Sequence, residues 1–184
     1  MKNIFIALRL LFYFTLLTGI IYPLCITGIA KRFFANSAQG SLIEYKGKMI
    51  GSALIGQNFK NPKYFWSRPS AIDYNPLPSG GSNLGPTSKE LQNQVQQRKN
   101  QGLAFDLLFT SASGLDPHIS PDAAYFQIDR IAQARNLKES SVAELRRIVS
   151  SHIEKRQFGF LGEPRVNVLQ LNLAVDEKFL DHRL

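Results

Sequence analysis

The sequence predicts an α+β protein, in which a single N-terminal transmembrane helix precedes one compact soluble domain of mixed helices and strands. Residues 10–30 contain no charged side chain. The rest of the chain is long enough for one domain with a hydrophobic core but too short for two large ones. Both helix-like and strand-like apolar patterns occur in it. We therefore divide the chain into an N-terminal segment, residues 1–32, and a soluble domain, residues 33–184.

The uncharged stretch at residues 10–30 is long enough to cross a bilayer, because a helix rises about 1.5 Å per residue and the hydrocarbon core is about 30 Å thick. The alternative is a cleaved signal peptide with a basic start at Lys2 and a small-residue site at residues 35–37. Such peptides have shorter apolar stretches, so we expect an anchor. Basic residues on the two sides nearly balance, so charge alone leaves the orientation open.

The formal charge of +8 is unevenly distributed. Half of it comes from Lys2, Arg9, Lys31 and Arg32, and no acidic residue lies among them. The excess left for the soluble domain is too small to indicate nucleic-acid binding. The single cysteine, Cys25, lies in the apolar stretch, so we expect neither a disulfide nor a cysteine metal site in the soluble domain.

The first half of the soluble domain begins with a predicted hairpin, whose strands at residues 41–45 and 49–54 flank a glycine turn. Residues 56–87 are rich in Gly and Pro but also in aromatic side chains, so we expect an ordered loop that packs on the domain or on a partner. Thr87 and Glu90 form a capping box that starts a polar helix extending to about Gly102. Residues 103–110 predict a buried strand.

The second half predicts two helices and a strand. Ser120 is a typical N-cap and Pro121 a typical first helical residue, so a helix is expected from there to about Arg135. Ser141 and Glu144 form a second capping box and start the next helix. Residues 166–175 predict a strand, in which a shift of the apolar phase suggests a bulge or burial on both faces.

Motifs for catalysis are weak. The glycine-rich residues 80–85 lack the lysine and the spacing of a phosphate loop. Ser113, Asp116 and His118 supply a nucleophile, an acid and a base, but residues so close in sequence rarely meet in triad geometry, and no G-x-S-x-G elbow surrounds the serine. We therefore favour a turn with local side-chain capping.

Metal and phosphate sites are also poorly supported. The three histidines, His118, His152 and His182, lack the spacing of a zinc site. Basic residues at 130–156 alternate with glutamates, which favours a solvated, ion-paired surface over a phosphate site.

Several stretches in order resemble one known family, the C subunit (KdpC) of Kdp-type potassium-transporting ATPases, over nearly the whole chain. They are GSALIGQ at 51–57, YF at 64–65, RPSA at 68–71, YN at 74–75, SGGSNL at 79–84, SASGLD at 111–116, ISP at 119–121, Gln127, Arg130, ARN at 134–136, VNV at 166–168 and LNLA at 171–174. Each stretch alone is weakly specific, and together they are a strong match.

The resemblance implies a non-catalytic accessory subunit of a high-affinity, ATP-driven potassium uptake complex. Such a subunit assists assembly and raises the ATP affinity of a separate P-type ATPase subunit. The implied partners are that subunit, a potassium-channel-like subunit and membrane lipid. No covalently bound cofactor is expected, and ATP is reached through the ATPase subunit. The implied location is single-pass in the cell inner membrane, with a cytoplasmic N-terminus and an extracytoplasmic soluble domain.

The resemblance also implies candidate site residues. A nucleotide role is ascribed to the family in the helical region near Asn136, and the candidates there are Gln127, Arg130, Arg135 and Asn136. The candidates for partner contact are Tyr64, Phe65, Arg68, Tyr74, Asn83 and Asp116. The alternative function is a free membrane-anchored binding or hydrolytic domain, which the turn at Ser113 and the basic helices motivate.

Overall fold

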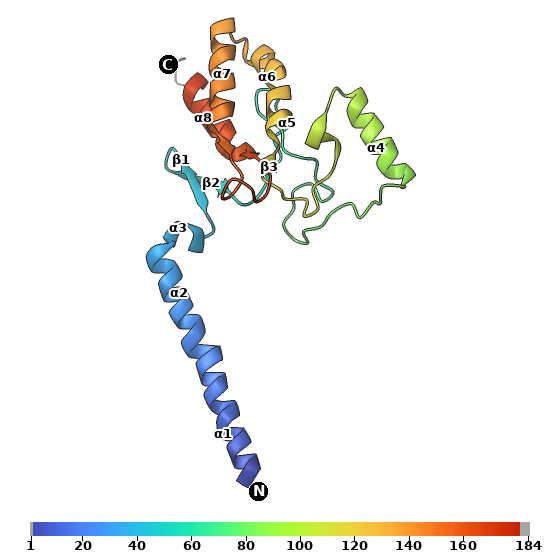
Figure 1. Ribbon diagram of the computed structural model, residues 1–184. Coiled ribbons are helices and arrows are strands. Elements are labelled where there is room, and N and C mark those ends of the chain that lie inside the picture. The colour runs from blue at the N-terminus through green and yellow to red at the C-terminus, as the bar shows by residue number, and fades with distance from the viewer. Residues whose placement is uncertain (1, 181–184) are drawn as a thin grey trace. The chain divides into compact units, whose positions relative to one another are not determined.

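The computed structural model describes residues 2–180 and begins with one long apolar helix (Figure 1). It comprises α1 (Lys2–Leu16), a π-helical turn (Leu17–Ile21) and α2 (Tyr22–Phe33). The helix is apolar and none of its residues is buried within the protein, so by length and composition it could cross a membrane. The π-helical turn is followed by α2, whose second residue, Pro23, lacks the N–H of a regular helix. The predicted N-terminal helix is confirmed.

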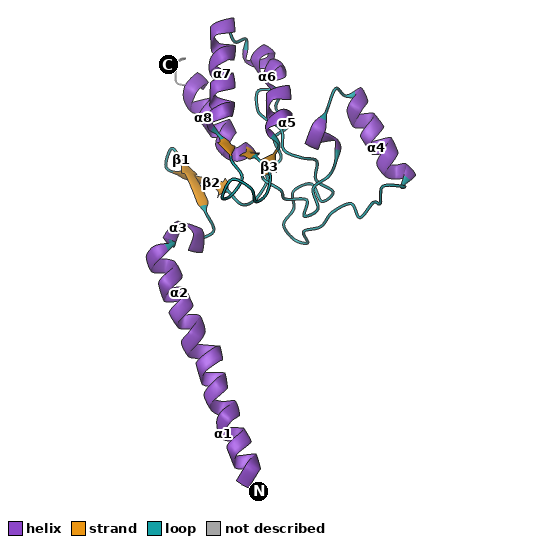
Figure 2. Ribbon diagram, viewed as in Figure 1, coloured by secondary structure: helices purple, strands orange, loops and turns teal. Residues whose placement is uncertain are grey.

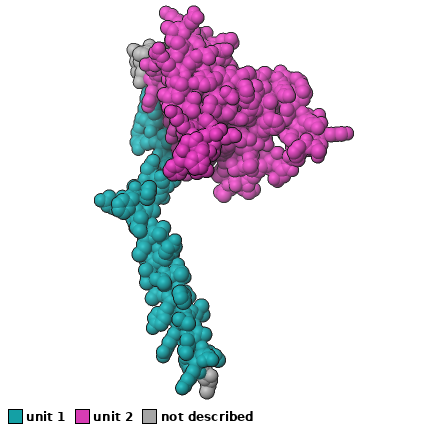
Figure 3. Space-filling view, in the orientation of Figure 1, with its two compact units in different colours: residues 1–52 teal, residues 53–184 magenta. Residues whose placement is uncertain are grey.

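Two compact units make up the chain, residues 1–52 and residues 53–184 (Figure 3). After the long helix, the first unit contains α3 (Ala35–Ala38) and an antiparallel hairpin of β1 (Leu42–Tyr45) and β2 (Lys48–Ser52). Its turn residues Lys46 and Gly47 both have positive φ. The predicted hairpin is thus confirmed, while the proposed domain boundary after residue 32 stays a prediction.

The second unit combines helices with one small sheet, which confirms the α+β class (Figure 2). Its strands are antiparallel neighbours in the order β3-β5-β4. The elements are α4 (Lys89–Asn100), a 3₁₀ helix (Phe105–Leu108), β3 (His118–Ile119), α5 (Pro121–Phe126), α6 (Ile128–Arg135), α7 (Glu139–Ser151), β4 (Ile153–Glu154), β5 (Arg165–Asn167) and α8 (Val168–Leu180).

The core of this unit lies among α5, α6, α7, α8 and the sheet. Fully buried apolar side chains from these elements form one cluster, which includes Ile128, Leu145 and Leu171. Phe65 joins the cluster from the loop at residues 56–87. By contrast, α4 buries none of its residues and lies apart from α7 and α8 (Figure 1), as its lack of an apolar stripe predicts.

The predicted strand at residues 103–110 is wrong, because the chain there forms a 3₁₀ helix. Phe105 has a positive φ of 54°, and Phe105 and Phe109 are exposed. The Asp106 carboxylate accepts a hydrogen bond from the Ser120 N–H, which holds the turn against the start of α5. Only Leu107 and Leu108 are buried, so the apolar run reflects one short turn.

The predicted strand at residues 166–175 is also largely wrong, because β5 ends at Asn167 and α8 begins at Val168. The buried residues Val168, Leu171, Asn172 and Val175 follow a helical spacing of three and four. A polar asparagine in that buried stripe obscured the pattern. The apolar phase shift marks the change from strand to helix.

Helix boundaries required smaller corrections. Ser88 caps α4 in place of Thr87, because its Oγ accepts a hydrogen bond from the Leu91 N–H. Helix α7 starts at Glu139, before the predicted capping box at Ser141. The helix expected to end at Arg135 is interrupted at Gln127 and forms α5 and α6. The Ser120 N-cap is confirmed by its 3.2 Å bond from the Ala123 N–H.

Candidate functional site

Two buried amide side chains hold the centre of the loop at residues 56–87, which we call the aromatic loop. Asn172 on α8 accepts a hydrogen bond from the Phe65 N–H at 2.7 Å and donates one to the Phe65 carbonyl at 3.0 Å. Gln127, between α5 and α6, makes the same pair with Trp66 at 2.8 and 3.3 Å. Each amide thus satisfies both backbone groups of one loop residue, as a neighbouring strand would. These bonds fix the loop while the Phe65 ring fills the core.

Arg130 on α6 holds the same loop at its edge. Its guanidinium donates to the carbonyls of Pro62 and Tyr64 at 2.6 and 3.0 Å and to Gln127 Oε1 at 2.7 Å. It also lies 3.7 Å from the ring centroid of Trp66, within the range of a cation–π contact. Burial lowers the pKa of Arg130 to about 10, so the side chain remains cationic at neutral pH.

Arg135 and Asp176 form a buried ion pair beside this loop, with side chains that are 7% and 14% exposed. Arg135 Nη2 lies 2.7 Å from Asp176 Oδ1, and Arg135 Nε donates to the Lys63 carbonyl at 2.8 Å. The Tyr64 hydroxyl donates to the other Asp176 oxygen at 2.8 Å. Burial, followed by this hydrogen bond, raises the pKa of Tyr64. The pair therefore orients the loop through both its backbone and its tyrosine.

Three of the four nucleotide candidates lie together in this network, and their polar groups are directed at the loop. The fourth, Asn136, ends α6 in a left-handed conformation with φ of 53°. It borders an open hollow that also carries Asp129 and Glu139. Those carboxylates would repel a phosphate at that position. A direct nucleotide contact by Gln127, Arg130, Arg135 and Asn136 stays a prediction.

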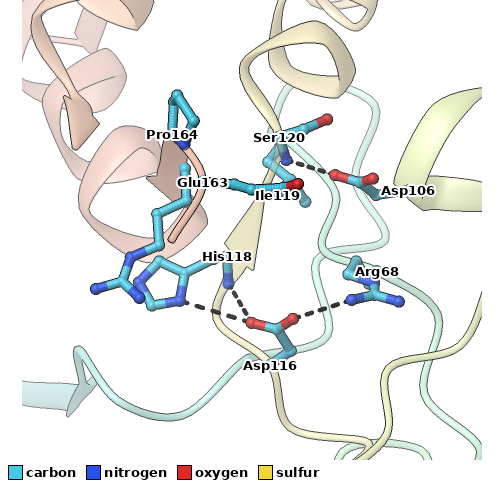
Figure 4. Close-up of a pocket in the computed structure, with 9 residues that line it drawn as sticks. Arg68, Asp106, Asp116, His118, Ile119, Ser120, Glu163 and Pro164 are labelled. Atoms are coloured by element: carbon cyan, nitrogen blue, oxygen red, sulfur yellow. Dashed lines mark hydrogen bonds and ion pairs between the residues drawn. The ribbon is translucent and has the colours of Figure 1, made fainter. Parts of the chain in front are cut away.

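A separate pocket of about 310 Å³ lies between the loop, the start of α5 and the segment before β5. Figure 4 shows Arg68 and His118 on either side of Asp116, with Asp106 bonded to the backbone of Ser120. Arg68 Nη1 lies 3.2 Å from Asp116 Oδ2, and the other Asp116 oxygen accepts the His118 N–H at 3.0 Å. Glu163 and Arg165 also line the pocket. Both signs of charge are therefore present in the pocket.

The charge of Asp116 is stabilised by its neighbours. Burial alone would raise the pKa of Asp116, but hydrogen bonds from His118 and the positive charge of Arg68 outweigh that effect and lower it. Arg68 also donates to the Thr110 carbonyl at 3.3 Å, while its buried Nε has no hydrogen-bond partner among residues 2–180. Arg68 and Asp116 thus join the loop to the segment that leads into β3.

Close backbone contact fixes the position of Asp116. The Gly56 N–H donates to the Leu115 carbonyl at 2.7 Å. A Cβ atom on Gly56 would lie 2.6 Å from the Asp116 carbonyl oxygen, closer than real Cβ atoms come. A glycine is therefore required here by the approach of the two backbones.

The turn at Ser113 has the local capping that we expected. Ser113 Oγ accepts a hydrogen bond from the Leu115 N–H at 3.1 Å. Asp116 and His118 meet in the pocket, with Nδ1 of His118 3.6 Å from Asp116 Oδ1. Within the described part of the chain, no hydrogen bond joins Ser113 to His118, so these residues do not form a nucleophile–base pair there.

The six candidates for partner contact differ in how accessible they are. Phe65 is fully buried and Tyr64 is half-buried. The Tyr74 hydroxyl donates to the Arg68 carbonyl at 2.6 Å, and burial raises the pKa of Tyr74 to about 12. Asn83 is exposed and has a φ of 54°. Arg68 and Asp116 line the pocket, and a partner contact by any of the six stays a prediction.

Several residues of the two sites were not identified from the sequence. Asp106 lies in the segment at residues 103–110 that the apolar pattern predicts as a strand. Glu163 and Arg165 lie in the turn before the predicted strand at residues 166–175. Asn172 and Asp176 are four residues apart, a spacing that places both on one face of a helix. Among residues 2–180, no cluster of three His, Cys, Asp or Glu side chains could hold a metal ion. His182 lies outside the described residues.

Comparison with known proteins gives one consistent result. Residues 4–177 match the family model described as "KdpC: K+-transporting ATPase, c chain". The chain is 51% identical to the potassium-transporting ATPase KdpC subunit of Bradyrhizobium diazoefficiens, with 92% of this chain and 94% of that protein aligned. It is 52% identical to the KdpC subunit of Geobacter metallireducens, with 96% and 98% aligned. It is 47% identical to the KdpC subunit of Leptospira interrogans, with 95% and 93% aligned.

Proposed function

This chain belongs to the KdpC family, the c chain of K+-transporting ATPases, and we propose that it is a non-catalytic accessory subunit that assists assembly and raises the ATP affinity of a separate P-type ATPase subunit. The observation that carries this proposal is the family match, which extends from inside the N-terminal helix to inside α8. The chain therefore shares both the membrane segment and the second unit with its relatives.

The proposed partners are a potassium-channel-like subunit, the P-type ATPase subunit and membrane lipid. The long helix supports this proposal, because the apolar side chains that it carries are exposed within the chain itself. Lipid or neighbouring helices would cover them. In this proposal the helix both anchors the subunit and contributes to assembly.

We place the soluble domain outside the cytoplasm, with the N-terminus inside. A large domain after a membrane segment is translocated largely regardless of its charge, so this orientation is compatible with Lys31 and Arg32. Protease added to sealed, right-side-out vesicles should digest the soluble domain while the N-terminal residues stay protected. Digestion only after the vesicles are opened would contradict the orientation.

ATP is assigned to the ATPase subunit in this proposal. The guanidinium groups of Arg130 and Arg135 already donate to loop carbonyls and to Asp176, which supports that assignment. A photoreactive ATP analogue should therefore label the ATPase subunit of the complex. Labelling of residues 127–135 of this chain that excess ATP suppresses would contradict it.

Co-purification tests the proposal most simply. Tagged full-length chain, extracted in mild detergent from cells that also express the other subunits, should retain the channel-like and ATPase subunits. A variant without residues 2–33 should lose both. A control in which an unrelated transmembrane helix replaces those residues separates anchoring from specific helix contacts. Failure of the full-length chain to retain either subunit would refute the assignment.

A further inference from the structure

A hairpin between β4 and β5 presents the most exposed aromatic side chains of the second unit. Phe158 is 87% exposed and Phe160 is 71% exposed, and Leu161 beside them is 48% exposed. The hairpin is closed by two hydrogen bonds of 2.9 Å between Gln157 and Leu161. Exposed apolar side chains on a closed turn of this kind are typical of binding sites. We call residues 155–161 the aromatic tip.

The backbone of the aromatic tip is unfavourable for the residue that it carries. Phe158 and Gly159 have φ of 53° and 84°, the pattern of a type I′ turn, in which Asn-Gly is strongly preferred. A bulky residue at positive φ is strained. The Phe158 ring is too exposed to gain compensating contacts within the chain. Stability therefore does not explain a phenylalanine at this position, whereas binding does.

The charges around the aromatic tip distinguish between a lipid surface and a protein. Lys155 and Arg156 begin it, and neither has an ion-pair partner among residues 2–180. Glu154 and Glu163 border it, and Arg165 pairs with Glu154 at 2.8 Å. Attraction to anionic lipid takes about four to eight clustered basic residues. The alternating charges here are too few for that, but they suit a partner with a defined pattern of charge.

We propose that the aromatic tip docks on another subunit of the potassium-transporting ATPase, in an apolar pocket that takes Phe158 and Phe160 and whose rim carries carboxylates for Lys155 and Arg156. This inference rests on the proposed function, because it requires the complex to exist. The closed turn fixes the backbone at both positions before binding, so little backbone entropy is lost on docking. Aromatic and arginine side chains that enter a desolvated pocket are the usual centres of such interfaces.

Phe158→Asn in the full-length chain tests this inference, with Phe105→Asn as its matched control. Both positions are exposed and have φ near +54°, a conformation that asparagine adopts readily. Both variants should therefore fold. The thermal midpoint of Phe158→Asn should equal or exceed that of the unchanged chain, whereas that of Phe105→Asn should be equal or slightly lower, because Phe105 also packs edge-on against the Phe126 ring. Phe158→Asn should dissociate from the detergent-extracted complex at least tenfold faster, and Phe105→Asn at the unchanged rate. Equal rates for the two variants would overturn the inference.

Crosslinking identifies the occupant directly. The full-length chain with Phe158→p-benzoylphenylalanine, irradiated in native membranes, should form an adduct with another subunit. An adduct with lipid alone, or no adduct in membranes where the complex co-purifies, would overturn the inference. If the unchanged chain retains no other subunit, the proposed function itself fails, and that result is distinct from an intact complex without a crosslink at the aromatic tip.

Discussion

Replacement of Asn172 by alanine should destabilise the second unit strongly, because one buried side chain satisfies two backbone groups of Phe65. Asn172 is 2% exposed and its two hydrogen bonds are 2.7 and 3.0 Å long. A buried polar group without a partner costs about 1–3 kcal/mol. With two such groups and some entry of water, we expect a loss of about 2–4 kcal/mol. For a chain of this size that is a fall in melting temperature of roughly 5–15 °C.

Trp66, the only tryptophan, adjoins Phe65 and reports unfolding of the loop by its fluorescence in detergent. The matched control is Gln170→Ala, an exposed position on the same helix, which should change stability by less than about 0.5 kcal/mol. Asn172→Asp should also destabilise, since it keeps an acceptor for the Phe65 N–H but turns a second acceptor towards the Phe65 carbonyl. If Asn172→Ala and Gln170→Ala unfold at the same denaturant concentration, the amide does not hold the loop.

Three further predictions follow from the geometry. Because the pKa of Asp116 is lowered in the folded protein, its carboxylate stabilises the fold at pH values above its ordinary pKa of 3.8, and this contribution is lost as the pH falls through the lowered pKa. Asp116→Asn should therefore flatten the acid side of the pH–stability profile, and an unchanged acid side would contradict this. The raised pKa of Tyr74 has the opposite consequence, because its contribution to stability is full below pH 10 and is lost as the pH rises towards about 12. Tyr74→Phe should cost about 1 kcal/mol of unfolding free energy at neutral pH and should reduce the loss of stability at alkaline pH, as measured by urea titration. Gly56→Ala should lower the free energy of unfolding by about 1–3 kcal/mol, because the added Cβ would meet the Asp116 carbonyl, whereas Gly80→Ala, with open space around it, should be close to neutral. Equal effects of the two variants in thermal unfolding would show that the two backbones can separate.

Local signals in the sequence predict the parts of the fold that depend on neighbouring residues. The long apolar N-terminal helix, the first hairpin and the Ser120 cap each follow from a few adjacent side chains, and each is confirmed. The segment after Asn167 was misassigned because its apolar residues alone fit an alternating pattern, while its helical stripe includes the buried Asn172. That asparagine is inside because it pairs with a residue more than a hundred positions away, which no local pattern shows.

The candidate residues divide in the same way. Gln127, Arg130 and Arg135 are nucleotide candidates through the family resemblance, and the structure brings them together around the aromatic loop. Their partners there are mostly backbone carbonyls, which a sequence pattern does not specify. The pocket lined by Arg68 and Asp116 likewise depends on four segments whose proximity is set by the tertiary fold. Gly56 lies in one of the stretches that resemble the family, but the need for a glycine there is visible only where its backbone meets that of Asp116.

The most direct test of the central claim is the ATP concentration that gives half-maximal potassium-stimulated ATPase activity, measured for the complex with and without this chain. Our account predicts a lower half-saturating ATP concentration when the chain is present, and no ATP hydrolysis by the chain alone. An unchanged half-saturating concentration, in preparations where the chain is bound to the other subunits, would contradict the proposed role.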